Sequence, residues 1–370
     1  MSVGYHAVSH YSSLSNQRAF RLLGELGMTN YVNHRYLRYY GATSALDAIL
    51  GVRYVFDTEE RRPGMADTGA GSGDTKVYRN ENALPLAYFA DTAALSALPE
   101  EGSPFTRQNA LFNQLAGTAD VPYFESLPVT AAFSGRISEA DGRMNLDGTG
   151  TLTFTIDNPK EQDVLLYVKN NLYENTAVYL RGKRLNVYDD RLVTGYRPQF
   201  YFRTTDVTGV IELGRQPAGK VEVSFYVTGQ RKWIAAPLAA GFDEEAFEAL
   251  TDGLRQGGAD SLTVTDTAVT GRIAAPRDGL LFTTIPMDSG WSAELDGKAV
   301  KAETAFGAFL AVPVTAGEHS FRLVFRPKGL KAGAALSAVG LALAVVWIGM
   351  DIRKRRRETR WAGETDDGEK

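Results

Sequence analysis

Few residues in this chain combine a reactive type with a useful spacing. The sequence contains four histidines and no cysteine. His6 and His10 lie four residues apart, which would place them on one side of a helix as a metal-binding pair. The segment "GYHAVSHY" has no acidic third ligand nearby and its pattern favours a strand or loop. We therefore expect ordinary structural histidines and no metal site here.

A second group of candidates lies in "YVNHRYLRYY", where tyrosines alternate with arginines. Tyrosine rings can stack on sugars, and arginine pairs with phosphate groups. Tyr36, Arg38, Tyr39 and Tyr40 are thus candidate contacts for an anionic sugar polymer. The alternative is an aromatic core seam whose arginines reach to the surface.

The third candidate is Trp291 in "MDSGWSAELDGK", with Asp288 beside it. This pair could form a sugar-binding platform at a loop tip, although a tryptophan entering a strand is also a common core anchor. Asp189 and Asp190 are adjacent and would face opposite sides of a strand, which is unsuitable for a catalytic pair. Nucleophile-elbow, phosphate-loop and dinucleotide patterns are lacking. The sequence therefore predicts no catalytic residue and no cofactor.

Composition narrows the class of protein further. The net charge of −4 gives no general basis for binding nucleic acid. The lack of cysteine excludes disulfide frameworks, thiolate zinc sites and cysteine nucleophiles. With 37 glycines, 17 tyrosines and 18 phenylalanines, the chain favours strands and turns over a helical bundle.

The elements that must position these residues differ along the chain. Residues 1–126 mix helix and strand and are expected to form an α/β region outside the membrane. The predicted elements are a helix capped by Ser13 or Ser15, a short capped helix over 43–51, a strand over 52–56, a charged mobile loop over 57–76 and a helix over 103–117.

Residues 127–235 alternate apolar and polar side chains between turn signals, which predicts an antiparallel β-sandwich or jelly roll. A helical linker over 236–260 separates it from a second sandwich-like block over 261–328. Both blocks contain a Gly-Lys hairpin turn, at Gly182 and Gly297, and a later Ala-Gly turn, at 218–219 and 316–317. We interpret this as a recurring supersecondary unit and not as a strict repeat.

The chain ends in an apolar segment followed by a basic cluster. Ala332 to Met350 carries no charge and is long enough to cross a hydrocarbon core of about 30 Å. We predict a transmembrane helix over 329–350 and a basic cytoplasmic tail over 351–370. The stop signal is Arg353, Lys354, Arg355, Arg356 and Arg357, which by the positive-inside rule leaves the preceding region extracytoplasmic. The first 30 residues show no export signal, so we expect further membrane segments upstream.

Several motifs, in order, resemble the C-terminal part of the YfhO-type family of bacterial membrane proteins. They are "GYHAVSHYSS", "YYGATSALDAILGVRYVF", "NENALPLAYF", "SPFTRQNALFNQLAG", "FDEEAFEAL", "DGLLFTTIPMDSGWSAELDGKAV" and "AGEHSFRLVFRPKGLKAG". The resemblance covers nearly the whole chain. The "IPMDSGW…DGK" segment is its most specific part, although the family more usually has tyrosine at the position of Met287.

The resemblance implies a function that the residues alone do not. The family is similar to GT-C glycosyltransferases, which use a sugar carried on a polyprenyl phosphate, and it is implicated in glycosylating teichoic or lipoteichoic acid. In that fold the catalytic acid lies in an early outer loop that this chain lacks, so no residue here inherits the role. Tyr5, His6 and His10 would lie just beyond the membrane, near the active cavity.

We therefore expect the outer, C-terminal portion of a lipid-linked-sugar transferase without its catalytic membrane half. The alternative is a non-catalytic, membrane-anchored module that holds glycans. The expected partners are the lipid bilayer, upstream transmembrane helices of the same or a companion chain, and an anionic wall polymer, with no role for nucleic acid.

Overall fold

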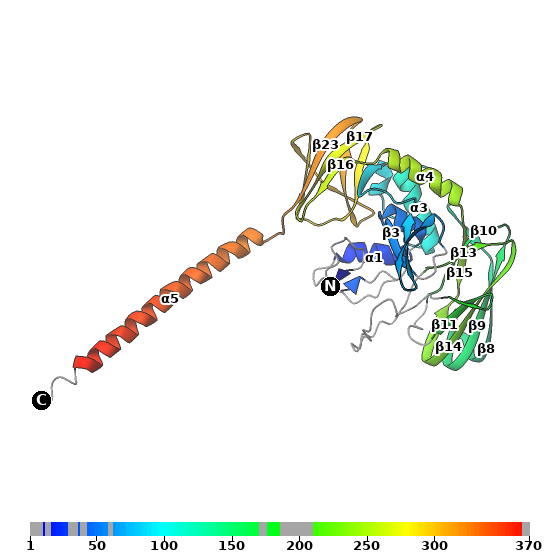
Figure 1. The fold of residues 1–370 in the computed structure, drawn as a ribbon, viewed down its shortest axis with the longest axis horizontal. Coiled ribbons are helices and arrows are strands. Elements are labelled where there is room, and N and C mark those ends of the chain that lie inside the picture. Colours follow the sequence, from blue (N-terminus) through cyan, green and yellow to red (C-terminus); the bar gives the residue numbers. More distant parts are fainter. Residues whose placement is uncertain are drawn as a thin grey trace.

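The computed structural model describes residues 10–11, 16–28, 36–37, 43–57, 62–169, 176–185 and 210–364. They form an elongated body of antiparallel sheets and short helices, from which one long helix extends (Figure 1). The predicted fold class, mainly β with antiparallel sandwiches and a final apolar helix, is confirmed.

The first β-sandwich, sandwich I, lies at the end of the body away from the long helix (Figure 1). Its outer sheet has the order β12-β11-β14-β9-β8 and its inner sheet the order β13-β10-β15-β7. The outer strands are β8 (Val129–Ala140), β9 (Arg143–Asn158), β11 (Thr176–Leu180), β12 (Lys183–Leu185) and β14 (Gly219–Ala235). The inner strands are β7 (Phe124–Leu127), β10 (Gln162–Tyr167), β13 (Val210–Gln216) and β15 (Leu238–Phe242).

Alternation along the strands explains the core of sandwich I. Leu152, Phe154 and Ile156 point inward from β9, where they meet Val223 and Phe225 of β14. The threonines between the inward-pointing residues of β9 face outward. This is the period-two pattern of a sheet with one solvent-exposed face, as the sequence predicts.

The second sandwich, sandwich II, has nearly the same topology. Its outer sheet has the order β16-β17-β23-β19-β20 and its inner sheet the order β21-β22-β18-β6. The outer strands are β16 (Asp260–Val264), β17 (Ala268–Ala275), β19 (Trp291–Leu295), β20 (Lys298–Val300) and β23 (Gly317–Phe325). The inner strands are β6 (Ala87–Ala90), β18 (Gly279–Pro286), β21 (Glu303–Ala305) and β22 (Phe309–Val314).

The supersecondary unit predicted from the two turn pairs is present in both sandwiches. The Gly182 turn joins β11 to β12, and the Gly297 turn joins β19 to β20. The Ala-Gly turns lead from β13 to β14 and from β22 to β23, so each crosses from the inner to the outer sheet. In both outer sheets the first hairpin strand then pairs with the strand after the crossing.

Short helices fill the space between the two inner sheets. They are α1 (Gln17–Glu25), α2 (Ser44–Ile49), α3 (Pro104–Ala116), α4 (Glu244–Gln256) and the 3-10 turn η1 (Thr92–Leu95). Phe112 of α3 and Phe247 of α4 are fully buried there, with ring centroids 5.3 Å apart. The same core takes Phe242 from sandwich I and Phe282 from sandwich II, so each inner sheet is buried on both faces.

The sequence signals for the helix ends are mostly confirmed. Ser103 caps α3, and Gly117 ends it with φ of 70°. Thr43 caps α2, the helix predicted as capped. Asp243 caps α4, at a position for which no cap was predicted. The prediction for α1 is wrong in one respect, because Asn16 is the cap, accepting hydrogen bonds from the backbone N–H groups of Arg18 and Ala19.

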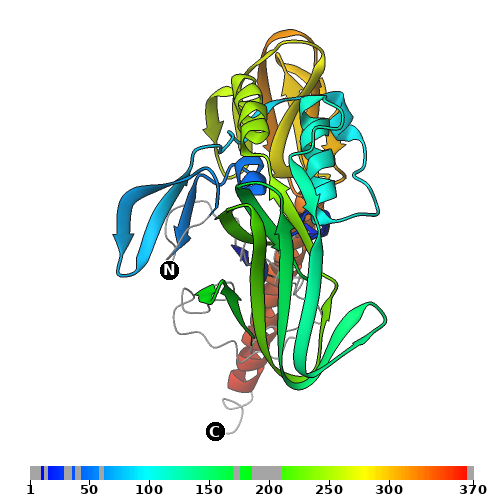
Figure 2. The same ribbon diagram turned by 90° about the vertical axis from the view of Figure 1, so that its right-hand side faces the viewer.

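The prediction of a mobile loop over 57–76 is also wrong for the residues described. β4 (Met65–Ser72) and β5 (Thr75–Asn80) form a hairpin that β3 (Tyr54–Asp57) extends to three strands. This sheet projects from the body (Figure 2). Glycine-rich composition suggests a loop, but Gly71 lies so close to the facing strand that a Cβ there would be 2.3 Å from the Thr75 carbonyl oxygen.

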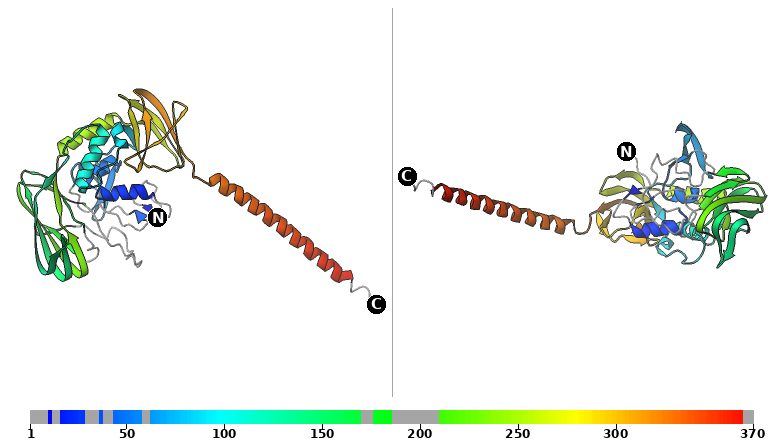
Figure 3. Two further views of the ribbon diagram at one scale, coloured as in Figure 1. Left: turned by 180° about the vertical axis from the view of Figure 1, so that it is seen from behind. Right: turned by 90° about the horizontal axis from the view of Figure 1, so that it is seen from below.

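The final helix, α5 (Leu330–Glu364), projects from the body on its own (Figure 3). Ala332–Arg355 within it is long and apolar enough to cross a membrane, and an 18-residue window of it has a mean hydropathy of 2.0 and is not buried in the protein. This agrees with the predicted transmembrane helix, and the helix continues through the basic cluster.

Candidate functional site

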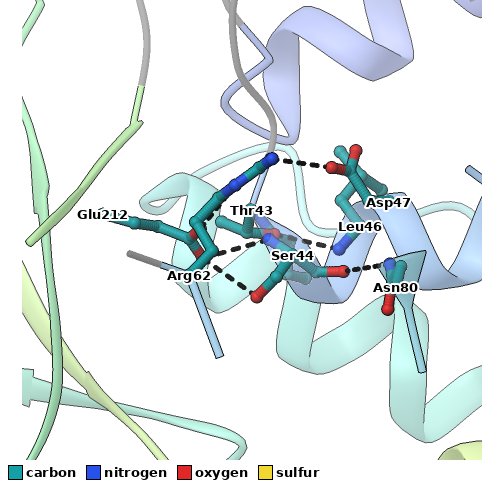
Figure 4. A network of polar contacts seen from close by, with 8 residues as sticks. Thr43, Ser44, Leu46, Asp47, Arg62, Asn80 and Glu212 are labelled. Carbon is teal, nitrogen blue, oxygen red and sulfur yellow. Dashed lines mark hydrogen bonds and ion pairs between the residues drawn. The ribbon is translucent and has the colours of Figure 1, made fainter. Parts of the chain in front are cut away.

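The described residues bring together a buried polar network that joins α2 to sandwich I (Figure 4). Arg62 donates a 2.8 Å hydrogen bond from Nη1 to Oδ2 of Asp47, and its Nε lies 3.7 Å from Oε2 of Glu212. Both carboxylates are almost completely buried, whereas the Arg62 side chain is 12% exposed. The network thus places one cation between two buried anions.

Local structure explains how these groups meet. The backbone N–H and hydroxyl of Ser44, in the first turn of α2, donate to Oε1 of Glu212 at 3.0 and 3.2 Å. Glu212 comes from the edge strand β13 of the inner sheet. Asn80, at the end of β5, donates to the Ser44 carbonyl at 3.4 Å. Three separate elements are therefore fixed to one another.

A hydrogen-bonded chain extends the network toward α3 and α1. The Thr43 hydroxyl donates to Oε1 of Gln108 at 2.7 Å and accepts from the Leu46 N–H, while Nε2 of Gln108 donates to the Leu26 carbonyl at 2.8 Å. The charges of the network pair with one another inside the protein, so the network holds the elements of the helix layer together. Removing one partner of a buried ion pair strongly destabilises a folded protein, which fits a structural role for the network.

Sequence reasoning missed this network. The signal for Glu212 is a charged residue in the otherwise apolar strand "VIELG". Arg62 falls in the stretch predicted as a loop, so nothing local indicated that its side chain is buried. Asp47 lies within the capped helix that was predicted, but its ion pair depends on contacts that no short pattern contains.

The candidate loop of Asp288 and Trp291 lies where sandwich II meets α5. Arg326 donates its backbone N–H to the Gly290 carbonyl at 2.9 Å, and Trp291 pairs with Phe325 at the end of β23. Asn16 also donates a 2.8 Å hydrogen bond from Nδ2 to the Met287 carbonyl. The N-cap residue of α1 and the segment that leads from β23 to α5 thus both contact this loop.

The side chains of the loop have clear local partners. Trp291 is half-buried against the sandwich II core, and the centroids of its ring and the Phe325 ring are 5.1 Å apart. Asp288 is exposed, and its Oδ1 accepts the Gly290 N–H at 2.7 Å, which shapes the turn. These contacts describe a packed anchor at a loop tip; contact with a sugar stays a prediction for both residues.

Two of the other candidates are brought together at the backbone level. β1 (His10–Tyr11) pairs with β2 (Tyr36–Leu37), with His10 opposite Leu37 and Tyr11 opposite Tyr36. Tyr5, His6, Arg38, Tyr39 and Tyr40 lie outside the described residues. Of the stop signal, Arg353, Lys354 and Arg355 are exposed on α5, which continues through Arg356 and Arg357.

Two further polar groups have perturbed ionisation. His319 Nδ1 lies 2.7 Å from Oδ2 of Asp296, and this hydrogen bond raises the pKa of His319 and lowers that of Asp296. The pair joins the Gly297 turn to β23, at the opposite end of β19 from Trp291. In sandwich I, burial together with the nearby charge of Glu244 raises the pKa of Asp163 to about 6, and the charge of Arg215 opposes this shift.

Neither group makes a complete reactive site. His319 Nε2 lies 3.1 Å from the Thr315 carbonyl oxygen, so the ring is held on both sides by the turn. Among the described residues, no three histidine, aspartate or glutamate side chains are grouped so as to hold a metal ion.

Comparison with known proteins identifies the family. The family described as "Bacterial membrane protein YfhO" matches residues 1–337. The uncharacterized protein YfhO of Bacillus subtilis (strain 168) is 30% identical over 108 residues, which are 28% of this chain and 12% of that protein. The matched region therefore spans only a small part of this relative.

Solved structures give weaker similarities. An arabinofuranosyltransferase AftD from Mycobacteria is 14% identical, over 48% of this chain and 14% of that one, with a TM-score of 0.20. A family 2 glycosyl hydrolase from Bacteroides cellulosilyticus is 9% identical, over 75% of this chain and 31% of that one, with a TM-score of 0.19. The family match, which covers most of the chain and agrees with the apolar helix, shows that this chain belongs to the YfhO family of bacterial membrane proteins.

Proposed function

We propose that this chain is the extracytoplasmic C-terminal portion of a membrane glycosyltransferase that takes its sugar from a polyprenyl-phosphate carrier. The acceptor in this proposal is a cell-wall polymer such as teichoic or lipoteichoic acid. The catalytic residues would come from a membrane half, in the same or a companion chain. Family membership and the apolar helix α5 support the proposal.

The observation that carries the proposal is that Asn16, the N-cap residue of α1, and Arg326, in the segment that leads to α5, both contact the loop Met287–Trp291. Only residues 326–329 separate β23 from α5. An extended chain advances at most about 3.6 Å per residue, so this tether spans at most about 18 Å. With α5 in the membrane, the loop would lie close to the bilayer surface, where a lipid-linked sugar is presented.

The orientation follows from charge in this proposal. Arg353, Lys354 and Arg355 are exposed at the far end of α5, and by the positive-inside rule they would remain in the cytoplasm. The body would then lie outside the cell. The lipid bilayer and the upstream transmembrane helices are its proposed immediate partners.

Labelling of single cysteines tests this orientation, because this chain has no cysteine of its own and any cysteine elsewhere in the whole protein is first replaced by serine. Ser138→Cys on exposed β8 should react with a membrane-impermeant maleimide in intact cells that express the whole protein. Lys354→Cys should react only after the cells are permeabilised. The reverse pattern would reject the proposed orientation.

The sugar content of the wall polymer tests the proposed transferase activity. Cells lacking the whole protein should produce wall polymer that has lost one sugar substituent, measured by NMR of the purified polymer, and the wild-type gene should restore it. An unchanged sugar content would contradict the proposal.

A second function, a membrane-anchored module that holds glycans without transferring sugar, is favoured by the outward face of sandwich I, which displays tyrosines and hydroxyl groups. It predicts glycan binding together with an unchanged polymer composition.

A further inference from the structure

The outer face of sandwich I forms a flat surface that the proposed sugar transfer does not use. It belongs to the strands β11, β14, β9 and β8, at the end of the body away from α5 (Figure 1). We call it the hydroxyl face, after the side chains that point outward from it: Tyr179, Ser224, Tyr226, Thr151, Thr153, Thr155, Thr130 and Ser134.

Strand register arranges these side chains in rows across the sheet. In one row Tyr226 lies opposite Thr151, which lies opposite Ser134. In the next row Tyr179 lies opposite Ser224, and Ser224 opposite Thr153. The rows are continuous, because the hydroxyl oxygens of Thr153 and Ser224 are 3.2 Å apart.

The aromatic component of the face is a pair of tyrosines. The rings of Tyr179 and Tyr226 are 5.1 Å apart between centroids and nearly perpendicular, at 81°. Tyr226 is 51% exposed. An exposed, rigid ring beside hydroxyl groups offers both an apolar face and hydrogen-bonding partners at a low entropy cost.

Sandwich II supplies an internal comparison, because its outer sheet has the same strand order. The turns at Arg181-Gly182 and Asp296-Gly297 both have positive φ at both residues. Tyr179 and Glu294 each lie two residues before the first residue of their turn, so they occupy equivalent positions. Ser224 pairs with Tyr179 across the sheet and Arg322 pairs with Glu294, so Ser224 and Arg322 are also equivalent.

The equivalent position in sandwich II is therefore charged. Arg322 Nη1 lies 3.9 Å from Oε2 of Glu294. The same fold thus accepts an ion pair at this place, and sandwich I has a tyrosine and a serine there. The fold alone does not require the uncharged surface, which points to a difference in what the two faces bind.

The charges on the hydroxyl face indicate its class of ligand. The row of Tyr226, Thr151 and Ser134 contains no charged residue over strands β11, β14, β9 and β8. Charged residues of both signs lie in the neighbouring rows: Arg184 of β12 is opposite Tyr179, Glu222 is opposite Thr155, and Lys220 is paired with Asp157 at 3.0 Å. An anionic polymer or an anionic membrane surface would require a surface with an excess of cations, whereas an uncharged polyhydroxylated chain needs rings and hydroxyl partners.

We propose that the hydroxyl face is a binding platform for a neutral glycan chain. Tyr226 packs against the C–H face of one sugar ring, and the hydroxyl groups of Thr151, Thr153 and Ser224 bond to those of the glycan. This rests on the second proposed function, the glycan-holding module, and specifies its ligand class and residues. It is separate from the proposed sugar transfer, because the face lies in the sandwich remote from the loop Met287–Trp291 and holds its ligand without chemistry.

The test uses the full chain in lipid nanodiscs, because detergents with sugar headgroups would compete for the face. The probes are arrayed neutral glucan, galactan and N-acetylglucosamine oligosaccharides of four or more units, with poly(glycerol phosphate) as the anionic comparison. We expect saturable binding to a neutral oligosaccharide. Tyr226→Ala should raise its dissociation constant about tenfold, as expected for the loss of one stacking ring.

Matched variants separate stacking from folding. Tyr226→Phe keeps the ring and should retain most of the affinity. Tyr54→Ala removes a tyrosine that is 53% exposed on another sheet and should leave the affinity unchanged. The double variant Tyr179→Glu with Ser224→Arg installs the pair of sandwich II and should abolish binding with little change in the melting temperature.

Three outcomes would overturn the inference: no binding to any neutral oligosaccharide at millimolar concentration, binding only to poly(glycerol phosphate), or equal affinity of wild type and Tyr226→Ala. None of them bears on wall-polymer composition, which tests sugar transfer separately. Binding with unchanged polymer would support the platform and reject the transfer.

Discussion

Arg62 lies between two buried carboxylates, and this determines what its removal should do. In Arg62→Ala the buried carboxylates of Asp47 and Glu212 would each lose their ion pair with this guanidinium. Breaking a buried pair in this way costs about 3–5 kcal/mol. Denaturant unfolding of the full chain should show a loss of that size.

The control is an arginine in an exposed pair. Arg79 Nη2 lies 2.6 Å from Oε1 of Glu81, and about half of each side chain is exposed. Arg79→Ala should therefore cost less than about 1 kcal/mol. Adding Glu212→Gln to the Arg62→Ala variant should recover part of its stability, and equal losses for the two arginine variants would show that the buried network is unimportant.

The His319–Asp296 pair should make stability depend on pH in both directions. The pKa of His319 is raised above 6.5, so its contribution is complete below that pH and is lost as the pH rises through the folded-state value. The pKa of Asp296 is lowered below 3.8, so its contribution is complete above that pH and is lost on further acidification. The contribution of the pair is therefore largest between pH 3.8 and 6.5.

The measurement compares melting temperatures of wild type and His319→Gln at pH 3, 5 and 8. The difference should be largest at pH 5 and smaller at both extremes. At pH 8 the neutral imidazole can still hydrogen-bond to Asp296, so some difference should persist. A difference that does not vary with pH would mean that the charge of His319 contributes nothing.

At the scale of elements, helix ends are fixed by contacts beyond the helix itself. Gly117 ends α3 with φ of 70°, and a Cβ at this position would lie 2.5 Å from Oδ2 of Asp91. Gly117→Ala therefore adds a steric clash to the backbone strain. Gly142 has nearly the same φ, 68°, with open space around it.

A comparison of the two glycine variants separates the cost of backbone strain from the cost of a steric clash. Gly142→Ala should cost roughly 1 kcal/mol, which is the strain of a left-handed residue. Gly117→Ala should cost roughly 2–3 kcal/mol, because Asp91 must also move. Chemical denaturation measures both, and equal costs would show that the contact with Asp91 is easily relieved.

At the scale of the whole molecule, the helix layer should make the two sandwiches unfold together. Phe112 contacts the rings of Tyr123, Phe124 and Phe247 in the core that both inner sheets share. Phe112→Ala should cost about 3–5 kcal/mol. Hydrogen exchange should then quicken in strands of both sandwiches, for example β10 and β18.

Phe154→Ala is the matched control, because Phe154 is equally buried but lies within the core of sandwich I. Its effect on exchange should be greatest in β9 and β14. If Phe112→Ala quickened exchange in one sandwich only, the two would be independent units joined by a passive helix layer.

Local patterns accounted for much of the fold. Caps at Thr43, Ser103 and Asp243, alternation along β9 and β14 and the turns at Gly182 and Gly297 are all properties of a few neighbouring residues. The family resemblance could be recognised from the sequence for the same reason, because it rests on short motifs. Composition misled where glycine-rich residues 65–80 form a hairpin, because pairing with β3 outweighs the local preference for a loop.

The candidate sites were less accessible to sequence reasoning. Trp291 could be singled out by type, but its position beside the start of α5 depends on its pairing with Phe325. The Arg62–Glu212 contact joins residues far apart in the chain. The hydroxyl face becomes visible only when the strands that carry Tyr179, Tyr226 and Thr153 are placed in register.

The sequence by itself determined the apolar helix, the basic cluster after it and the alternating strands, because hydrophobic length and period are local quantities. Only the tertiary structure decided which strands share a sheet. β6 (Ala87–Ala90) pairs with β18 of sandwich II, whereas β7 (Phe124–Leu127) pairs with β15 of sandwich I. The physical reason is that an edge strand is stabilised by whatever partner completes its hydrogen bonds and buries both its faces, and that partner can lie anywhere along the chain.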